Sequence, residues 1–258
     1  MLLCIDIGNT NITLGLYEGE RLGPRWRLAT DHERMPDEFA LQLLGLLGLA
    51  GLSADAVDDV AIASVVPPLT GKWVEVCRTY LGCDPLVVDG HVETGVRIRY
   101  EDPTAVGADR IVDAVAAYRL YGGPACIVDF GTATTFDALS AEGDYLGGAI
   151  APGIGIAADA LFQRTAKLPR VEIARPPSAI GRNTVHAIQS GLLFGYVALV
   201  EGMVARFRAE LGPEMRVIGT GGLAELIAQE TPVIQIIAPW LTLDGLRMVY
   251  AMNRGNVT

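Results

Sequence analysis

Two short turns carry the residues in this sequence that are best suited to chemistry. Asp6–Asn11 (DIGNTN) follows the apolar run 2–5, and Asp129–Thr135 (DFGTATT) follows the apolar run 125–128. Each turn offers one carboxylate, a glycine and small side chains that form hydrogen bonds. Backbone N–H groups and hydroxyls in such a turn can surround phosphate oxygens, while the carboxylate holds a metal ion. A single turn of this kind would fit an ordinary polar hairpin equally well, but here the pattern occurs twice.

A third candidate is the segment Gly107–Arg110 (GADR), which precedes an apolar helical pattern over 111–121. Asp109 and Arg110 therefore fall in the first turn of an expected helix. The helix dipole favours an acidic residue there, so Asp109 alone is explained by capping. The same dipole opposes an adjacent arginine unless that arginine serves an anion. The segment therefore either caps the helix or meets an anionic ligand.

A glycine turn, Gly219–Gly222 (GTGG), lies between an expected strand at 215–218 and an expected helix at 223–229. Such a turn lets the backbone approach a ligand closely and directs helix N–H groups toward it. Glycine turns are common, so this one is informative only in combination with the two Asp-x-Gly turns.

Other motifs in the sequence are weaker. Residues 153–158 match the dinucleotide pattern G-x-G-x-x-A. Pro152 precedes them, however, and a proline-interrupted connector leads to the acidic Glu172, which disfavours a dinucleotide site. No G-x-x-x-x-G-K-[ST] motif occurs, and the DFG at 129–131 lacks the partner motifs of protein kinases.

Hydrophobic patterns predict the elements that must position these turns. After an opening hairpin at 2–16, we expect strands at 26–30, 57–66 and 86–88, and helices at 36–49, 68–80 and 111–121. A second hairpin at 125–138 opens a similar series, with strands at 145–150, 215–218 and 233–237, and helices at 153–162, 183–211, 223–229 and from 241. The two Asp-x-Gly turns are 123 residues apart, close to half the chain. The sequence therefore predicts two similar α/β halves, 1–115 and 116–258, with mixed sheets.

Composition limits the class of protein. The chain has 258 residues, half of them hydrophobic, and 30 glycines, which suits one large or two small globular domains. A net charge of −10 with scattered Lys and Arg argues against a nucleic-acid partner, although local amides and Mg²⁺ still allow a nucleotide. The four cysteines form no C-x-x-C motif, so we expect reduced thiols. No basic leader and no apolar stretch of ~20 residues is evident, so we expect a cytoplasmic protein with no membrane partner.

Taken together, the segments resemble one family. The two Asp-x-Gly turns and the glycine turn look like those of the actin, Hsp70 and sugar kinase superfamily. Within it, the chain is similar to the type III pantothenate kinases, and the similar segments follow the family order along nearly the whole chain. They are Asp6–Asn11, Ser64–Pro68 (SVVPP), Gly107–Arg110, Asp129–Thr135, Gly147–Gly153 (GGAIAPG), Asn183–Thr184 and Gly219–Gly222.

The resemblance implies an α/β fold with two similar ribonuclease H-like halves, the actin-like or sugar kinase ATPase fold, with mixed sheets around a central nucleotide cleft. It implies ATP-dependent phosphorylation of the pantothenate hydroxyl to 4'-phosphopantothenate, the first step of coenzyme A biosynthesis. The implied cofactors are ATP, Mg²⁺ and a monovalent cation, K⁺ or NH₄⁺. The family also implies a homodimer, in which the long helix of the second half packs against its mate and the pantothenate pocket lies at the interface.

The resemblance also implies roles for residues of this chain. ATP would be bound by Asp6, Ile7, Gly8, Asn9, Thr10, Asn11, Ile12, Thr13, Thr132, Gly219, Gly221 and Gly222. Pantothenate would be bound by Tyr100, Gly107, Ala108, Asp109, Arg110 and Thr184. Asp6 would hold Mg²⁺ through water, Asp129 would ligate the monovalent cation, and Asp109 would act as the general base. Arg110 would meet either the substrate carboxylate or the transferring phosphoryl group, and the role of Thr13 stays open.

Two alternatives remain at this point. One is a kinase of the same superfamily that acts on another small alcohol. The other is a non-catalytic accessory homologue with the same fold. Asp109 beside Arg110 favours an enzyme, because an accessory protein has less need of a base in that turn.

Overall fold

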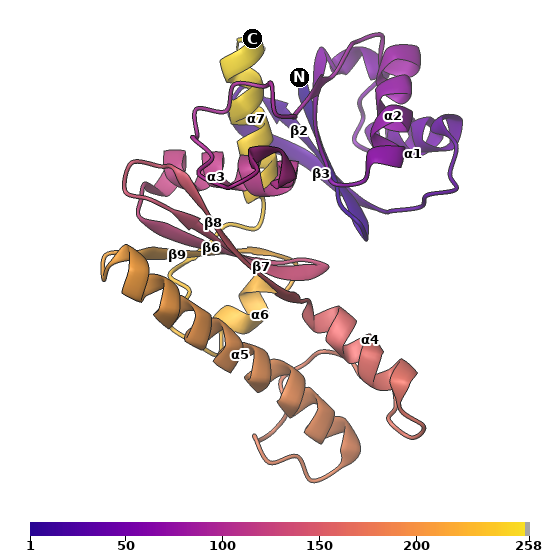
Figure 1. The fold of residues 1–258 in the computed structure, drawn as a ribbon. Coiled ribbons are helices and arrows are strands. Elements are labelled where there is room, and N and C mark those ends of the chain that lie inside the picture. The colour runs from indigo at the N-terminus through magenta and orange to yellow at the C-terminus, as the bar shows by residue number, and fades with distance from the viewer. Residues whose placement is uncertain (256–258) are drawn as a thin grey trace. The chain divides into compact units, whose positions relative to one another are not determined.

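The computed structural model describes residues 1–255, and the chain forms two compact units (Figure 1). Unit 1 comprises Met1–Ala116 together with the C-terminal segment from Leu241, and unit 2 comprises Ala117–Trp240. The division drawn from the sequence assigned all of 116–258 to the second half, whereas the last helix, α7 (Leu241–Arg254), packs on the first sheet. That the two units are separate domains stays a prediction.

The sheet of unit 1 has five strands in the order β3-β2-β1-β4-β5. Strands β1, β2 and β3 form an antiparallel meander, and β4 and β5 continue the sheet in parallel with β1. Their bounds are β1 (Leu2–Ile7), β2 (Asn11–Glu18), β3 (Arg21–Ala29), β4 (Asp59–Ser64) and β5 (Leu86–Val87). The third strand begins five residues earlier than expected. It crosses Pro24 because β3 is an edge strand, where a missing N–H costs no ladder bond.

Helices cover both faces of this sheet. Leu3, Ile5 and Ile7 of β1 point into a core built with α1 (Pro36–Leu49) and α2 (Pro67–Val76). Helix α7 lies on the opposite face, where its Leu243 would come within 2.6 Å of a Cβ at Gly15, so glycine is needed for that close approach. The hydroxyl of Tyr17 donates to Asp244 at 2.6 Å and ties α7 to β2.

The shorter segments of unit 1 complete the connections. They are η1 (Ala54–Ala56), the π-helical turn η2 (Cys77–Leu81), η3 (Pro103–Ala105) and the helix α3 (Ala108–Tyr121), which ends in unit 2.

The sheet of unit 2 repeats the plan of unit 1, with the order β10-β9-β6-β7-β8. Strands β6, β7 and β8 form an antiparallel meander, and β9 and β10 continue the sheet in parallel with β6. The bounds are β6 (Ala125–Phe130), β7 (Ala133–Leu139), β8 (Tyr145–Pro152), β9 (Arg216–Gly221) and β10 (Ile236–Ile237). The pairing scheme of the first sheet recurs strand for strand, which confirms the predicted α/β repeat.

The core of unit 2 lies between its sheet and helix α5 (Thr184–Leu211), with α6 (Ala224–Ala228) beside it (Figure 1). Helix α4 (Ile154–Arg164) follows β8. Helix α5 is long and apolar enough to cross a membrane by length and composition, contrary to what we expected from the sequence. One such helix is weak evidence for a span, and its buried face, which includes Ile188, Leu193 and Val200, packs in the core of unit 2. We therefore treat α5 as a core helix.

Candidate active site

The first Asp-x-Gly turn joins β1 to β2 and is tightly closed. The Gly8 N–H donates to the Asn11 carbonyl at 3.0 Å, and a Cβ at Gly8 would lie 3.1 Å from that oxygen. Thr30, which follows β3, donates twice to the turn: its hydroxyl to the Gly8 carbonyl at 2.6 Å and its N–H to the Thr10 carbonyl at 3.0 Å. The side chains of Asn9, Thr10 and Asn11 are exposed, so a ligand has access to the turn.

Asp6 lies in a row of residues on one face of the first sheet. It is opposite Thr13 on β2, and Thr13 is opposite Arg27 on β3. Neighbouring residues in such a row point to the same side of the sheet. The alternate positions, among them Ile5 and Ile7, form the core on the other side. The opposite face of the sheet, away from the core with α1 and α2, therefore carries Asp6, Thr13 and Arg27.

The carboxylate of Asp109 is held in the first turn of α3. Its Oδ1 accepts the Arg110 N–H at 2.8 Å and would lie 2.5 Å from a Cβ at Gly107. Glycine at 107 therefore leaves the space that the carboxylate occupies. The same hypothetical Cβ would be 3.2 Å from Val65, whose N–H donates to the Ile7 carbonyl at 3.1 Å. Val65 thus connects the Asp109 turn to the end of β1, next to Asp6.

The second Asp-x-Gly turn places the Asp129 carboxylate between two glycines. A Cβ at Gly131 would lie 3.2 Å from Oδ2, and a Cβ at Gly221 would lie 2.4 Å from Oδ1. Gly221 ends β9 with φ +85°, a conformation that favours glycine. The glycine turn and the second Asp-x-Gly turn therefore meet at this carboxylate. A side chain on either glycine would crowd it.

Thr132 follows in the same turn and lies against the end of β8. A Cβ at Gly153 would lie 2.1 Å from the Thr132 carbonyl oxygen and 2.9 Å from that of Gly131. Thr132 itself is exposed. The backbone of this turn is thus held in place while its side chain remains accessible.

The segment Gly219–Gly222 was expected to be a turn, but β9 continues to Gly221, so most of the segment is strand. Gly219 is buried inside the strand, where a Cβ would lie 2.9 Å from Ile234. Gly222 has open space around its Cα and precedes α6. A contact of ATP with Gly219, Gly221 or Gly222 stays a prediction.

The donor sets fit the cofactors that the sequence implied. Among residues 1–255, no group of three or more His, Cys, Asp or Glu side chains forms a metal site. Mg²⁺ needs no such cage, because in nucleotide enzymes it takes one or two carboxylates, phosphate oxygens and water. A single Asp6 beside an open turn fits that pattern. Asp129, a single carboxylate flanked by two glycines, fits a weakly held monovalent cation.

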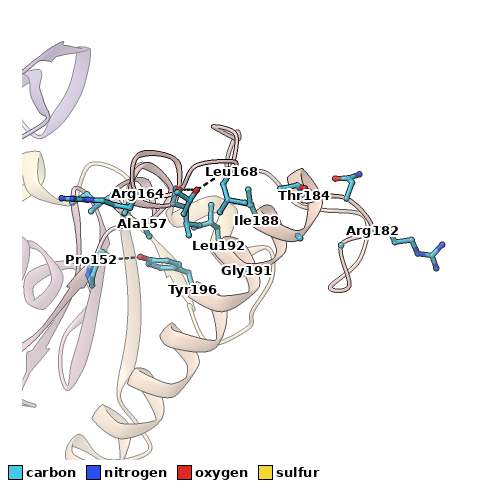
Figure 2. Close-up of a pocket in the computed structure, with 17 residues that line it drawn as sticks. Pro152, Ala157, Arg164, Leu168, Arg182, Thr184, Ile188, Gly191, Leu192 and Tyr196 are labelled. Carbon is cyan, nitrogen blue, oxygen red and sulfur yellow. Dashed lines mark hydrogen bonds between the residues drawn. The ribbon is translucent and has the colours of Figure 1, made fainter.

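A large groove lies between α4 and α5 within unit 2. Its volume is about 1120 Å³, and its walls include Ile156, Leu161, Ile188 and Leu192 (Figure 2). Thr184, the first residue of α5, lies at one end, after the N-cap Asn183, whose side chain accepts the His186 N–H at 2.8 Å.

At the other end of this groove, the Tyr196 hydroxyl donates to the Pro152 carbonyl at 2.7 Å (Figure 2). Tyr100, the other predicted pantothenate residue outside Gly107–Arg110, is 41% exposed in the irregular segment of unit 1.

The cysteines offer no alternative chemistry. All four are free thiols, and burial raises the pKa of Cys77 and of Cys126 to about 12. A buried thiol with a raised pKa is a poor nucleophile. The candidate site therefore rests on the carboxylates and turns described above.

Comparison with known proteins decides the family. The sequence profile of the type III pantothenate kinases matches residues 2–206 of this chain. The chain belongs to the type III pantothenate kinase family. The resemblance drawn from the sequence is thereby confirmed.

Relatives bearing the family name match this chain over nearly its whole length. A type III pantothenate kinase from Roseiflexus sp. (strain RS-1) is 54% identical over 254 residues, which cover 98% of this chain and all of the relative. The type III pantothenate kinase of Moorella thermoacetica is 54% identical over 253 residues, with the same coverage. That of Geobacter sulfurreducens is 53% identical over 254 residues, again with the same coverage.

Solved structures of low sequence identity confirm the fold alone. A protein from Sinorhizobium meliloti, described as a 2-dehydro-3-deoxygalactonokinase by assignment only, superposes with a TM-score of 0.63 at 14% identity, covering 100% of this chain and 98% of its own. A Baf family protein from Campylobacter jejuni, described as a transcriptional activator, superposes with a TM-score of 0.56 at 19% identity, covering 97% of both chains. The predicted sugar-kinase-like α/β fold is thus confirmed.

Proposed function

We propose that this family member transfers the γ-phosphoryl group of ATP to the hydroxyl of pantothenate, giving 4'-phosphopantothenate for coenzyme A biosynthesis. The observation that carries this proposal is the 54% identity, over 98% of the chain, to a protein named type III pantothenate kinase. The turns at Asp6, Asp109 and Asp129 support it, because each keeps the residue types that phosphoryl transfer needs.

The phosphates of ATP are assigned to the two Asp-x-Gly turns. Phosphoryl transfer depends on positioning and charge neutralisation more than on covalent help. Residues Asp6–Thr13 and Thr132 are assigned to the phosphates, and among them Asn9, Thr10, Asn11 and Thr132 are exposed. Gly219, Gly221 and Gly222 are assigned to the adenosine. Mg²⁺, when bound, neutralises phosphate charge, and Asp6 would hold it through water.

Asp109 is assigned as the general base. Its Oδ1 accepts the Arg110 N–H at 2.8 Å, which fixes the carboxylate at the start of α3. A carboxylate with an ordinary pKa near 3.9 is a weak base toward an alcohol. It nevertheless orients the hydroxyl and takes its proton as the new O–P bond forms. Arg110 offsets negative charge on the substrate carboxylate or on the transferring group.

Asp129 is assigned to the monovalent cation, K⁺ or NH₄⁺. The carboxylate lies between Gly131 and Gly221, where a side chain on either glycine would crowd it. The neighbouring Thr132 is assigned to the ATP phosphates. A cation there would reduce the repulsion between Asp129 and a phosphate nearby.

A second copy of this chain is assigned to the groove between α4 and α5. Large apolar side chains line or border it and are exposed in the single chain, among them Ile156, Leu161 and Phe162 of α4. A patch of this kind on a soluble protein usually marks an interface. Two-fold pairing through α5 would bring Thr184 of each copy to the interface, where we propose that it meets pantothenate together with Tyr100 and Gly107–Arg110.

We also propose a cytoplasmic location. The free cysteines would stay reduced there, and ATP is supplied in that compartment. The negative net charge of the chain supports a small-molecule substrate over a nucleic acid.

The proposal is tested by following ADP release from purified protein given ATP, Mg²⁺ and K⁺ with a panel of small alcohols. ADP release that depends on pantothenate supports the proposal. Release with a different alcohol alone would instead indicate another kinase of the superfamily. Binding of ATP with no turnover on any alcohol would indicate an accessory protein.

A further inference from the structure

The residue that follows the third strand of each sheet contacts the Asp-x-Gly turn of the same unit. In unit 1 this residue is Thr30, after β3, and in unit 2 it is Gly153, after β8. Thr30 and Gly153 are 123 residues apart, which is also the separation of Asp6 and Asp129. The same place in the repeated fold therefore supports the turn in both units.

Thr30 supports its turn with two hydrogen bonds. Its hydroxyl donates to the Gly8 carbonyl at 2.6 Å, and its N–H donates to the Thr10 carbonyl at 3.0 Å. In a planar trans peptide the C=O and the following N–H point in opposite directions. Fixing these two carbonyls toward Thr30 therefore directs the N–H groups of Asn9 and Asn11 away from Thr30.

The segment after Thr30 is itself anchored. The ammonium group of Lys72, on α2, donates to the His32 carbonyl at 2.9 Å and to the Arg34 carbonyl at 2.8 Å. These bonds join the segment that follows β3 to α2, a helix of the core. Because these bonds do not involve the Thr30 side chain, we expect a change in that side chain to act on the turn and leave the anchored segment in place.

Gly153 supports the second turn by close packing. Its φ of −69° is open to any residue, so its backbone conformation does not require glycine. Space does, because a Cβ would lie 2.1 Å from the Thr132 carbonyl oxygen. A side chain at 153 would have to displace the turn that carries Thr132.

We propose that Thr30 and Gly153 are positioning residues for ATP, each of which fixes the backbone of one phosphate-binding turn. This rests on the proposed function only in assigning the two turns to ATP phosphates. Thr30 sets the direction of the N–H groups in Asp6–Thr13, and Gly153 keeps the Thr132 backbone in place. Neither residue is assigned a contact with the reacting atoms.

The test compares Thr30→Val, which keeps the shape and removes the hydroxyl, with Thr30→Ser, which keeps the hydroxyl. Calorimetric titration should show Thr30→Val binding ATP with Mg²⁺ about tenfold more weakly, the effect of one lost hydrogen bond at a ligand-binding turn. Thr30→Ser should bind within about threefold of wild type. In steady-state assays the KM for ATP should rise in Thr30→Val while that for pantothenate stays unchanged.

Wild-type ATP affinity in a folded Thr30→Val protein would overturn the role of Thr30. Equal weakening by Thr30→Val and Thr30→Ser would also overturn it, since the hydroxyl would then not matter. Should Thr30→Val fail to fold, Gly153→Ala is compared with Gly155→Ala, whose added Cβ meets open space. Unchanged ATP affinity in Gly153→Ala would contradict the proposal. Weaker ATP binding by Gly153→Ala, with wild-type binding by Gly155→Ala, would support it.

The ATP titration also separates this proposal from the proposed function. ATP binding to the wild-type protein without turnover of pantothenate would contradict the kinase assignment. The ATP affinities of the Thr30 variants could still be compared in that case. Pantothenate-dependent turnover together with unaltered ATP binding by the Thr30 and Gly153 variants would support the kinase assignment and contradict the positioning role of these two residues.

Discussion

A methyl group on the Cα of Gly221 would lie 2.4 Å from Oδ1 of Asp129. Because Gly221 carries no side chain, the end of β9 can lie close to this carboxylate at the end of β6. On the other side, a Cβ at Gly131 would lie 3.2 Å from Oδ2. The proposed cation site therefore depends on two glycines that carry no functional group themselves.

Substitution of Gly221 by alanine should impair cation-dependent activity. The added Cβ would press on Asp129, and alanine is strained at φ +85°. We expect the variant to lose about 1–3 kcal/mol of unfolding free energy and to need at least tenfold more K⁺ for half-maximal rate. Gly45→Ala, on the exposed side of α1, is the control, because its Cβ also meets open space. Equal K⁺ requirements in the two variants would contradict the assignment of Asp129.

Replacing K⁺ with Na⁺ at constant ionic strength should reduce the turnover of the wild-type protein severalfold. The smaller ion holds its water more tightly and suits a single carboxylate between two glycines less well. Initial rates of ADP release in the two salts provide the measurement. Indifference to the cation would undercut a specific ion at Asp129.

Asp109→Asn should keep ATP binding and lose turnover by two orders of magnitude or more. The amide fills the same space beside Gly107 but does not accept the hydroxyl proton. Rate assays and ATP titrations on the same preparation provide the measurement. Asp55→Asn, an exposed carboxylate on η1, serves as the control and should leave both unchanged. Near-wild-type turnover in Asp109→Asn would remove this residue as the base.

Ile156→Glu should convert the proposed dimer to a monomer. Ile156 lies on α4, lines the groove and is 48% exposed in the single chain. A buried unpaired carboxylate would disfavour association. Sedimentation should show the monomer. The KM for pantothenate should rise, because the interface at which Thr184 is proposed to meet pantothenate would no longer form. Leu49→Glu, at an 86% exposed position of α1, should keep the wild-type state. A wild-type chain that sediments as a monomer would disprove the pairing.

The contribution of Tyr250 to stability should fall as pH rises from about 10 to about 12. Burial, and next the hydrogen bond to Asp59 at 2.7 Å, raise the pKa of the Tyr250 hydroxyl from 10.0 to about 12. In this range the unfolded chain has lost the phenol proton while the folded protein retains it. Unfolding therefore releases a proton, and the free energy of unfolding falls as pH rises. At pH 8 the free energy of unfolding of the wild-type protein should exceed that of Tyr250→Phe by about 1 kcal/mol. Denaturant titrations that gave a constant difference from pH 8 to pH 12 would contradict this.

The sequence predicts the repeated plan well because its signals are local. Apolar runs, Asp-x-Gly turns and a 123-residue offset require no knowledge of tertiary contacts, and the sheets confirm them. The early start of β3 was missed because Pro24 reads as a break, although an edge strand accepts it.

Long-range contacts could not be predicted in this way. The packing of α7 on the first sheet includes a hydrogen bond between Tyr17 and Asp244, which are 227 residues apart. The support of the first turn by Thr30 was missed for a similar reason: a single threonine at the end of a strand carries no signal of its own. The position of Gly153 at the matching offset is the one clue that the sequence held.

The most direct measurement of the central claim is product analysis after incubation of the wild-type protein with ATP, Mg²⁺, K⁺ and pantothenate. Phosphorus NMR and mass spectrometry should show one phosphoryl group added to pantothenate as an ester of its 4'-hydroxyl, in equal amount to the ADP formed. ADP formed without phosphorylated pantothenate, or a phosphoryl group on the carboxylate instead of the hydroxyl, would contradict the account.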